Sequence, residues 1–223
     1  PPTGAGGKWV QTLASLGLAV TPLTSANCGW ETPWPAALLE KVEGLPLKNM
    51  VTHAGDHSRQ GELVITRYGL EGGPIYRLGP AIKALEAPQI QLDFKPTFTV
   101  DQLVRKMESV RRNFLLEAKQ RWKLSAGALA ILESLHGPFE DAESLARCAK
   151  RCTIPLTQPR PIDEAISSAG GVQWSGLDQN FMLQQHPGIF LAGEMLDWEA
   201  PTGGFLLQAA FATGTAAANG ALQ

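Results

Sequence analysis

The spacing of hydrophobic residues divides the middle of the chain into a strand-rich part and a helical part. Over residues 42–96, short runs of alternating apolar and polar positions are separated by turn-forming residues, and the clearest run covers residues 89–94. Over residues 99–151 the apolar residues recur every three to four positions, which is the spacing of a helix face. Several short strands with frequent turns predict a small barrel or a sandwich for the first part.

A capping box marks the start of the helical part. Thr99 stands three residues before Gln102, so each side chain can bond to the backbone amide of the other residue. The apolar spacing then predicts helices over residues 100–122, 125–135 and 140–151. The segment after them, residues 153–156, is strand-like.

Before residue 42, the pattern predicts a loop over residues 1–7, a helix over residues 8–16 and a short strand over residues 18–20 that ends at Pro22. An aromatic, proline-rich loop follows over residues 27–35. Its tryptophans, Trp30 and Trp34, are either packed beneath a surface loop or form one wall of an apolar pocket.

The carboxyl-terminal part combines short apolar runs with glycine pairs. Residues 187–192 predict a buried strand, and Thr202 is placed to cap a long helix of small residues over 205–219. A helix start has unpaired N–H groups and a partial positive charge, so it suits an electron-rich ligand atom. A second glycine pair, Gly170 and Gly171, precedes this segment.

Composition and charge exclude several classes of protein. The 223 residues are 44% hydrophobic and 18% charged, which is typical of a globular chain with a buried core. The net charge of −2 makes a nucleic-acid partner unlikely, because that affinity depends on cations that contact phosphates. Residues 163–223 contain six acidic residues and no Lys or Arg. No apolar run is long enough to predict a transmembrane helix, so we expect no membrane partner.

The cysteines predict a reducing compartment. An odd count of three favours the cytoplasm over a disulfide scaffold. Cys148 and Cys152 are four residues apart in a predicted helix and can meet on one face. Because no His or further Cys pair lies close to them in the sequence, two plain thiols are favoured over a metal site, and we expect no metal.

A basic segment offers an alternative function. Residues 105–123 contain seven basic and two acidic residues, which is typical of the solvent-exposed face of a helix. The same segment is the contact surface that a non-catalytic binding or interaction module would use. This alternative stays open at the level of the sequence.

Two motifs together resemble a known family. Residues 192–205 have the sequence AGEMLDWEAPTGGF, and residues 166–172 have the sequence ISSAGGV. They closely resemble a bacterial family of FAD-dependent oxidoreductases that carries a helical insert domain and includes enzymes called aminoacetone oxidase and bile-acid reductase. The region around Cys28 also looks like one subfamily of it, and the resemblance extends over essentially the whole chain.

The resemblance implies a mixed α+β and α/β fold in several segments. Residues 1–22 would be a remnant of a Rossmann-like FAD-binding domain, to which residues 163–223 return. Residues 23–96 and 152–162 would form an inserted small β-barrel, and residues 97–151 a helical insert domain. Family members open with a βαβ unit whose G-x-G-x-x-G loop binds the ADP half of FAD. That fingerprint fails here because position 9 is Trp, so we expect that the chain lacks this unit and binds FAD weakly by itself.

The resemblance also assigns roles to nine residues. Gly193 would allow the cofactor to approach the backbone closely, Glu194 would accept hydrogen bonds from ribityl hydroxyls, and Asp197 would orient the following loop. The backbone amides at the helix start would face the pyrimidine edge of the flavin, and the earlier glycine pair would pass near the isoalloxazine ring. The nine residues are Gly170, Gly171, Gly193, Glu194, Asp197, Thr202, Gly203, Gly204 and Phe205.

The function implied is hydride transfer between a flavin and a small organic substrate, with FAD as cofactor. Whether NAD(P)H is a second cofactor stays open at this point. Because the flavin carries this chemistry, the sequence identifies no catalytic side chain. An oxygen-using amine oxidase of the aminoacetone type is the alternative within enzymes. Trp30, Trp34 and Trp198 are candidates for pocket walls, with ordinary packing as the equal alternative for each.

Overall fold

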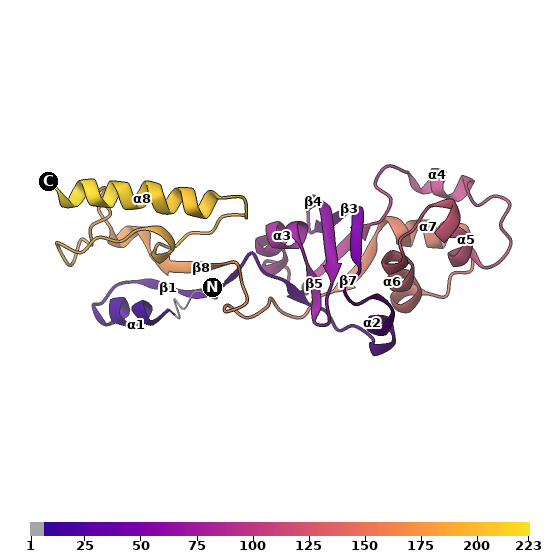
Figure 1. Cartoon of the computed structure of the whole chain (residues 1–223), viewed down its shortest axis with the longest axis horizontal. Helices are drawn as coiled ribbons and strands as arrows, with labels where there is room; N and C mark the ends of the chain where they lie inside the picture. Colours follow the sequence, from indigo (N-terminus) through magenta and orange to yellow (C-terminus); the bar gives the residue numbers. More distant parts are fainter. Residues whose placement is uncertain (1–6) are drawn as a thin grey trace. The chain divides into compact units, whose positions relative to one another are not determined.

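The structure is a computed structural model that describes residues 7–223, so most of the loop predicted over residues 1–7 lies outside the described residues. The chain divides into two compact units (Figure 1). Unit 1 contains the described residues up to Cys28 together with Arg160–Gln223, and unit 2 is Gly29–Pro159. Among the described residues, the longest helices are too short or too polar to cross a bilayer.

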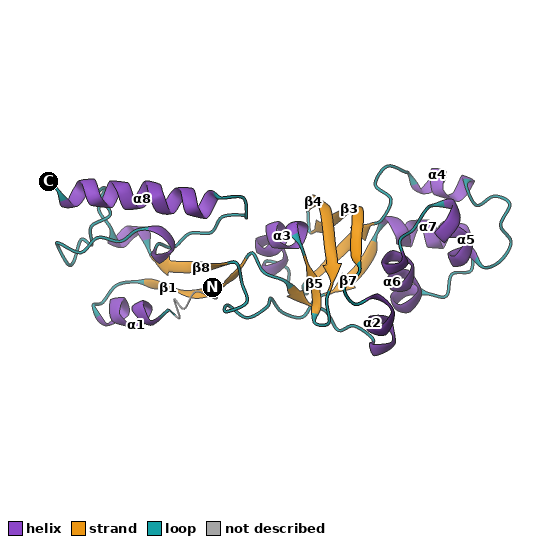
Figure 2. Ribbon diagram, viewed as in Figure 1, coloured by secondary structure: helices purple, strands orange, loops and turns teal. Residues whose placement is uncertain are grey.

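A curled antiparallel sheet forms the centre of unit 2 (Figure 2). In hydrogen-bonded order its strands are β2 (Trp30–Glu31), β5 (Gly69–Glu71), β4 (His57–Ile65), β3 (Pro46–Ala54), β6 (Gln89–Asp93) and β7 (Cys152–Pro155). The chain just after β7 returns to β2, because the Glu31 amide donates to the Gln158 carbonyl at 2.8 Å and the Thr157 amide donates to the Glu31 carbonyl at 2.9 Å. These two bonds join the two edges of the sheet. The sequence left a barrel and a sandwich open, and a sheet with joined edges matches the barrel.

Unit 2 contains two helices, α2 (Ala36–Val42) and α3 (Gly73–Lys83), that the sequence pattern did not predict. The second is a poor helix by composition, since it contains two glycines and two prolines. Ile75, Leu78 and Ile82 nevertheless follow helical spacing and are at most 1% exposed. Burying each such side chain stabilises the fold by about 1.5–3 kcal/mol, which outweighs the low helix propensity of the segment.

The helical part of unit 2 consists of α4 (Val100–Arg105), α5 (Phe114–Arg121), α6 (Ala126–His136) and α7 (Ala142–Lys150). The capping box is confirmed, with Thr99 Oγ1 accepting from the Gln102 amide and Gln102 Oε1 accepting from the Thr99 amide.

A continuous helix over residues 100–122 was a wrong prediction, because the chain leaves the helical path after α4. Asn113 adopts a left-handed conformation (φ 56°) just before α5. Trp122 then donates its indole N–H to the Leu103 carbonyl at 3.0 Å, which ties the end of α5 to α4. The same apolar positions are therefore buried by two short helices instead of one long helix.

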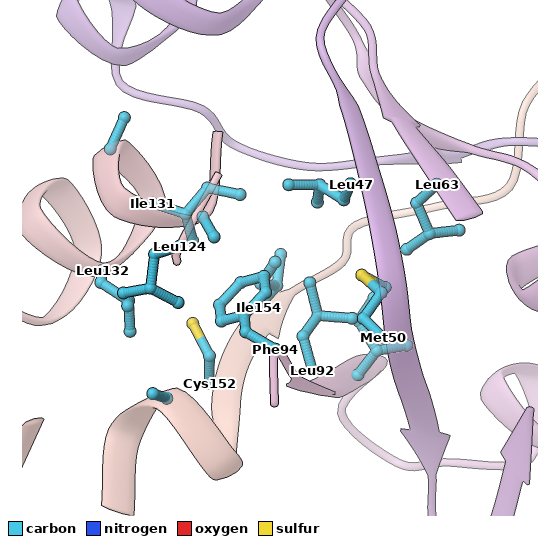
Figure 3. Packing of buried hydrophobic residues seen from close by; sticks show 14 of the residues in the cluster. Leu47, Met50, Leu63, Leu92, Phe94, Leu124, Ile131, Leu132, Cys152 and Ile154 are labelled. Carbon is cyan, nitrogen blue, oxygen red and sulfur yellow. The ribbon is translucent and has the colours of Figure 1, made fainter. Parts of the chain in front are cut away.

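One hydrophobic core joins the sheet of unit 2 to these helices. Figure 3 shows Leu92 and Ile154 from the strands beside Phe94, with Ile131 and Leu132 of α6 on the other side. The predicted return of residues 153–156 to the sheet is confirmed, since β7 pairs with β6 in antiparallel register.

Unit 1 is built on two antiparallel strands, β1 (Val20–Ala26) and β8 (Ser167–Val172). Its other elements are α1 (Lys8–Ser15), the short 3₁₀ helices η1 (Trp174–Gly176) and η2 (Gly193–Met195), and α8 (Phe205–Ala221). The helix predicted over residues 8–16 is thus confirmed to within one residue. The buried core of unit 1 consists of leucines and one valine, namely Leu13, Leu18, Val172, Leu177, Leu183, Leu191 and Leu196.

Two strand predictions for unit 1 were wrong. The strand expected over residues 18–20 is β1, which continues through Pro22 because the pairing with β8 has an irregularity between Thr21 and Thr24, where a proline is tolerated. The apolar run over residues 187–192 is not a strand. It makes a single bridge, between Met182 and Phe190, and Ile189 in its middle is 38% exposed.

Removing the capping hydroxyl tests the account of the helical part. We expect Thr99→Ala to lower the free energy of unfolding by about 1 kcal/mol, because it leaves the Gln102 amide in the first turn of α4 without its acceptor. Denaturant titration of the full-length protein measures this change. Thr97→Ala is the matched control, since Thr97 is equally exposed but lies outside the capping box. Equal stability of the two variants would contradict the account.

Candidate functional site

The candidate site of unit 1 begins where η2 packs against α8. Gly193 has a left-handed backbone (φ 64°), and its amide donates to Thr213 Oγ1 at 2.9 Å. A Cβ atom at this position would lie 3.4 Å from the Cβ of Ala210, so η2 and α8 are nearly in backbone contact. Thr213 Oγ1 also donates to the Ala209 carbonyl at 2.7 Å, which fixes its direction.

Glu194 follows directly and is exposed. Within residues 7–223 its carboxylate has no hydrogen bond and no ion pair. Because the preceding Gly193 is held on α8, the backbone that carries this free carboxylate is fixed while its two oxygens stay available to a ligand. An ionised carboxylate accepts hydrogen bonds, so these oxygens suit the hydroxyl groups of a ligand.

The start of α8 differs from the prediction in its cap. Gly204, not Thr202, is the N-cap residue, and no side chain caps the helix. Gly203 (φ 125°) and Gly204 (φ 88°) both adopt conformations that favour glycine, and the turn they form places the helix start beyond the reach of Thr202. The helix also continues through Gly220 to Ala221, beyond its predicted end at residue 219.

Two features make this helix start accessible. Among the residues that the structure describes, no group accepts a hydrogen bond from the amides of Gly203 and Gly204. No atom lies within 4 Å of the position that a Cβ of Gly204 would take. Free amides and open space beside the positive end of a helix suit an electron-rich ligand edge.

Asp197 anchors the loop between η2 and α8. Its amide donates to the Val172 carbonyl at 2.9 Å, and its Oδ2 accepts from Thr21 Oγ1 at 2.6 Å. The Trp174 indole N–H donates to the Asp197 carbonyl at 2.8 Å. The loop is thereby tied to both strands of unit 1, which are the contacts expected of a residue that orients it.

The glycine pair of β8 has a packing explanation. A Cβ at Gly170 would lie 2.4 Å from the Pro22 carbonyl oxygen, and a Cβ at Gly171 would lie 2.6 Å from the Leu196 carbonyl carbon. Glycine is therefore required here because β1 and the loop after η2 both pass directly against the backbone of β8. That these residues also pass near a flavin stays a prediction.

Asn27 is a residue of this region that the sequence analysis did not single out for a role. It is 4% exposed, and its side-chain amide donates to Ser167 Oγ and to the Ala200 carbonyl, both at 2.8 Å. It therefore joins the end of β1 to the start of β8 and to the loop before α8. Only its place in the stretch around Cys28, which resembles the subfamily, pointed to it.

The three tryptophans proposed as pocket walls are parts of the two cores. Trp30 is 2% exposed within the core of unit 2, so it packs there and does not line an open pocket. Trp34 is partly buried against the same core and donates to the Gly69 carbonyl at 3.2 Å. Trp198 packs against the core of unit 1.

Several cations of the basic segment have local partners. Arg121 pairs with Glu117 at 2.9 Å, and Arg111 donates to the Glu108 carbonyl at 2.5 Å. Lys106 lies over the ring of Phe98, with its ammonium nitrogen 4.8 Å from the ring centroid. Arg121 and Arg111 thus have partners within the segment, whereas Lys106 contacts Phe98 just before it.

The argument against a metal site at the cysteines rested on a wrong premise. Cys152 lies in β7 and not in a helix, and His136 at the end of α6 lies beside both cysteines. The Cys152 thiol donates a hydrogen bond to the Cys148 sulfur, which lowers the pKa of Cys148. The same contact, together with burial, raises the pKa of Cys152.

Unit 1 thus offers two features to a polar ligand: the exposed Glu194 carboxylate, whose neighbouring backbone packs against Ala210 and Thr213 of α8, and the open glycine amides at the start of that helix. The family model of the HI0933-like protein Rossmann domain matches residues 1–220, and the chain therefore belongs to this family.

A curated relative is the 3-dehydro-bile acid delta(4,6)-reductase of Clostridium scindens. The chain is 26% identical to it over 181 residues, which are 73% of this chain and 44% of the relative. The chain thus spans less than half the length of the curated relative that it matches.

The contact between η2 and α8 can be tested at a single hydroxyl. Thr213→Val keeps the shape of the side chain but removes the acceptor of the Gly193 amide, so hydrogen exchange at that amide should become about five- to thirtyfold faster, as expected for losing 1–2 kcal/mol. Hydrogen–deuterium exchange of the peptide around Gly193 measures this. Thr215→Val is the control. Thr215 Oγ1 also donates to a carbonyl of its own helix, that of Phe211, but it does not accept the Gly193 amide, which bonds to Thr213. The same exchange rate in both variants would contradict the assignment.

Proposed function

We propose that the protein carrying this chain is an FAD-dependent oxidoreductase that transfers a hydride between the flavin and a small organic substrate. Membership of the HI0933-like Rossmann domain family supports this class. The observations that carry it within the molecule are the free Glu194 carboxylate, on backbone held against Ala210 and Thr213 of α8, and the open, glycine-bounded start of the same helix.

The residues present fit one part of FAD. Glu194 would accept hydrogen bonds from ribityl hydroxyls, and the amides of Gly203, Gly204 and Phe205 would donate to the pyrimidine edge of the ring. The flavin, when bound, supplies the redox chemistry, and the partial positive charge at the start of α8 would stabilise negative charge on that edge. Phe205 has no hydroxyl, so its side chain offers no polar contact there.

The rest of the cofactor requires other groups. Residues 163–223 contain no Lys or Arg, so this segment offers no side-chain cation for the pyrophosphate. We propose that a glycine-rich βαβ unit elsewhere in the full-length protein binds it. Asp197 and Thr213 would act as positioning residues, because they hold the loop and η2 without facing the ring themselves. Gly170 and Gly171 would carry β8 past the isoalloxazine.

The two compact units suggest how the domains divide. We propose that unit 1 belongs to the FAD-binding domain and that unit 2 is an insert composed of the curled sheet and the helices α4 to α7. The boundary is placed after Cys28 and not after residue 22, because β1 pairs with β8 as far as Ala26.

For the second substrate we propose NAD(P)H, which makes the enzyme a reductase. The Clostridium scindens relative is named as a reductase, which supports this direction of electron flow. An amine oxidase would differ from this reductase in its electron partner, because it passes electrons to oxygen instead of taking them from NAD(P)H. The basic segment is not proposed as the functional surface, since three of its cations, Arg111, Arg121 and Lys106, already contact groups within unit 2.

The natural full-length protein provides the first test. We expect it to purify with flavin absorbance and to release FAD when it is denatured. Steady-state turnover should be faster with NADH or NADPH as donor than with an amine and oxygen. Colourless protein that cannot be reconstituted with FAD would contradict the proposal, and turnover with an amine and oxygen alone would replace the reductase by the oxidase.

The role of Glu194 can be tested with a matched variant. We expect Glu194→Ala to raise the dissociation constant of FAD about ten- to a hundredfold, because a hydrogen bond to a charged group contributes roughly 1.5–3 kcal/mol. Fluorescence titration of the deflavinated full-length protein measures this change. Glu199→Ala removes an exposed carboxylate of the same loop and should leave the affinity unchanged. Equal losses in the two variants would show that only the charge of the loop matters.

A further inference from the structure

A second cluster of reactive side chains lies in unit 2, apart from the residues proposed to bind the flavin. One ring nitrogen of His136 and the sulfurs of Cys148 and Cys152 all lie within 4.8 Å of one another. The three residues come from three different elements: the end of α6, the body of α7 and the start of β7. We propose that this cluster is a site for a soft divalent cation of the zinc class.

The donor set fits such an ion. Thiolate sulfur and imidazole nitrogen are the ligands that zinc takes in proteins, at about 2.3 Å and 2.0–2.1 Å. In a tetrahedral site these bond lengths put the ligand atoms about 3.4–3.8 Å apart, so the three atoms would have to approach one another by up to about 1 Å to enclose the ion. Three protein ligands leave a fourth position of the tetrahedron for water or another small ligand.

His136 is already held as a metal ligand would be. Its Nε2 lies 2.9 Å from the Thr153 carbonyl oxygen. A carbonyl only accepts hydrogen bonds, so Nε2 donates here and Nδ1 is the nitrogen that we propose to bind the cation. A bond from the second ring nitrogen to a backbone carbonyl is the usual way in which proteins orient a metal-binding imidazole.

The surroundings favour a soft ion over a hard one. Cys152 is fully buried, and Figure 3 shows its side chain among the apolar Leu124, Leu132 and Phe94. No carboxylate belongs to the cluster within the described residues. The positive charge of Lys150, which lies between the two cysteines in the sequence, is paired with Asp93 at 2.6 Å. The cation would tie α6, α7 and β7 together within unit 2.

Cobalt(II) provides a direct probe. The full-length protein, reduced and freed of metal with a chelator, should bind one Co²⁺ per chain with thiolate-to-cobalt charge-transfer absorption, measured as a difference spectrum so that flavin absorbance cancels. Added Zn²⁺ should remove this absorption by displacing the cobalt. A reduced protein that binds Co²⁺ without charge-transfer absorption, or that does not bind it, overturns the proposal.

Three variants test the ligand set. Cys148→Ser and His136→Gln should each weaken Co²⁺ binding by at least about a hundredfold, because even the hydrogen-bond partners of ligands change affinity ten- to a hundredfold. Cys28→Ser is the control, since Cys28 is a buried free thiol of unit 1 outside the cluster. Circular dichroism without metal shows whether each variant is folded. If folded Cys148→Ser binds Co²⁺ as tightly as Cys28→Ser does, the two thiols are plain core residues and the proposal is wrong.

Discussion

Close packing between backbone segments at glycine positions in unit 1 is the constraint on which its candidate site depends. The loop after η2 crosses β8 at Gly171, and η2 meets α8 at Gly193, where a Cβ would touch Ala210. A side chain at Gly171 would push the loop away, and Asp197 would then lose its bonds to the Val172 carbonyl and the Thr21 hydroxyl. The backbone that carries the free carboxylate of Glu194 is therefore held by close packing at Gly193, and the loop after η2 is held by close packing at Gly171.

Local sequence predicted those elements whose stability is local. The capping box at Thr99 and the helices α6 and α7 could be recognised because cap residues and apolar spacing lie within one segment. Helix α3 could not, since its prolines and glycines argue against a helix and only the burial of Ile75, Leu78 and Ile82 in a core formed by distant strands stabilises it. The apolar run over residues 187–192 failed for the converse reason, because a strand requires a partner and this run makes only one bridge in the described structure.

The candidate sites show the same division. A continuous motif identified Gly193, Glu194 and the glycines before α8, since these residues are neighbours in the chain. Thr213 and Asn27 act through contacts 20 or more positions away, and no spacing rule connects them to their partners. His136 is the plainest case. It was missed as a neighbour of Cys148 and Cys152 because α6 ends beside β7 only in the folded unit. Even Thr202, a good cap by residue type, was displaced by the turn that Gly203 and Gly204 form.

The most direct measurement is an experimental structure of the full-length protein with FAD bound. The account predicts that a Glu194 carboxylate oxygen lies within hydrogen-bond distance, about 2.5–3.0 Å, of a ribityl hydroxyl and that the Gly203 and Gly204 amides face the pyrimidine edge of the ring. A flavin bound elsewhere, or protein side chains filling the space in front of Gly204, would contradict it.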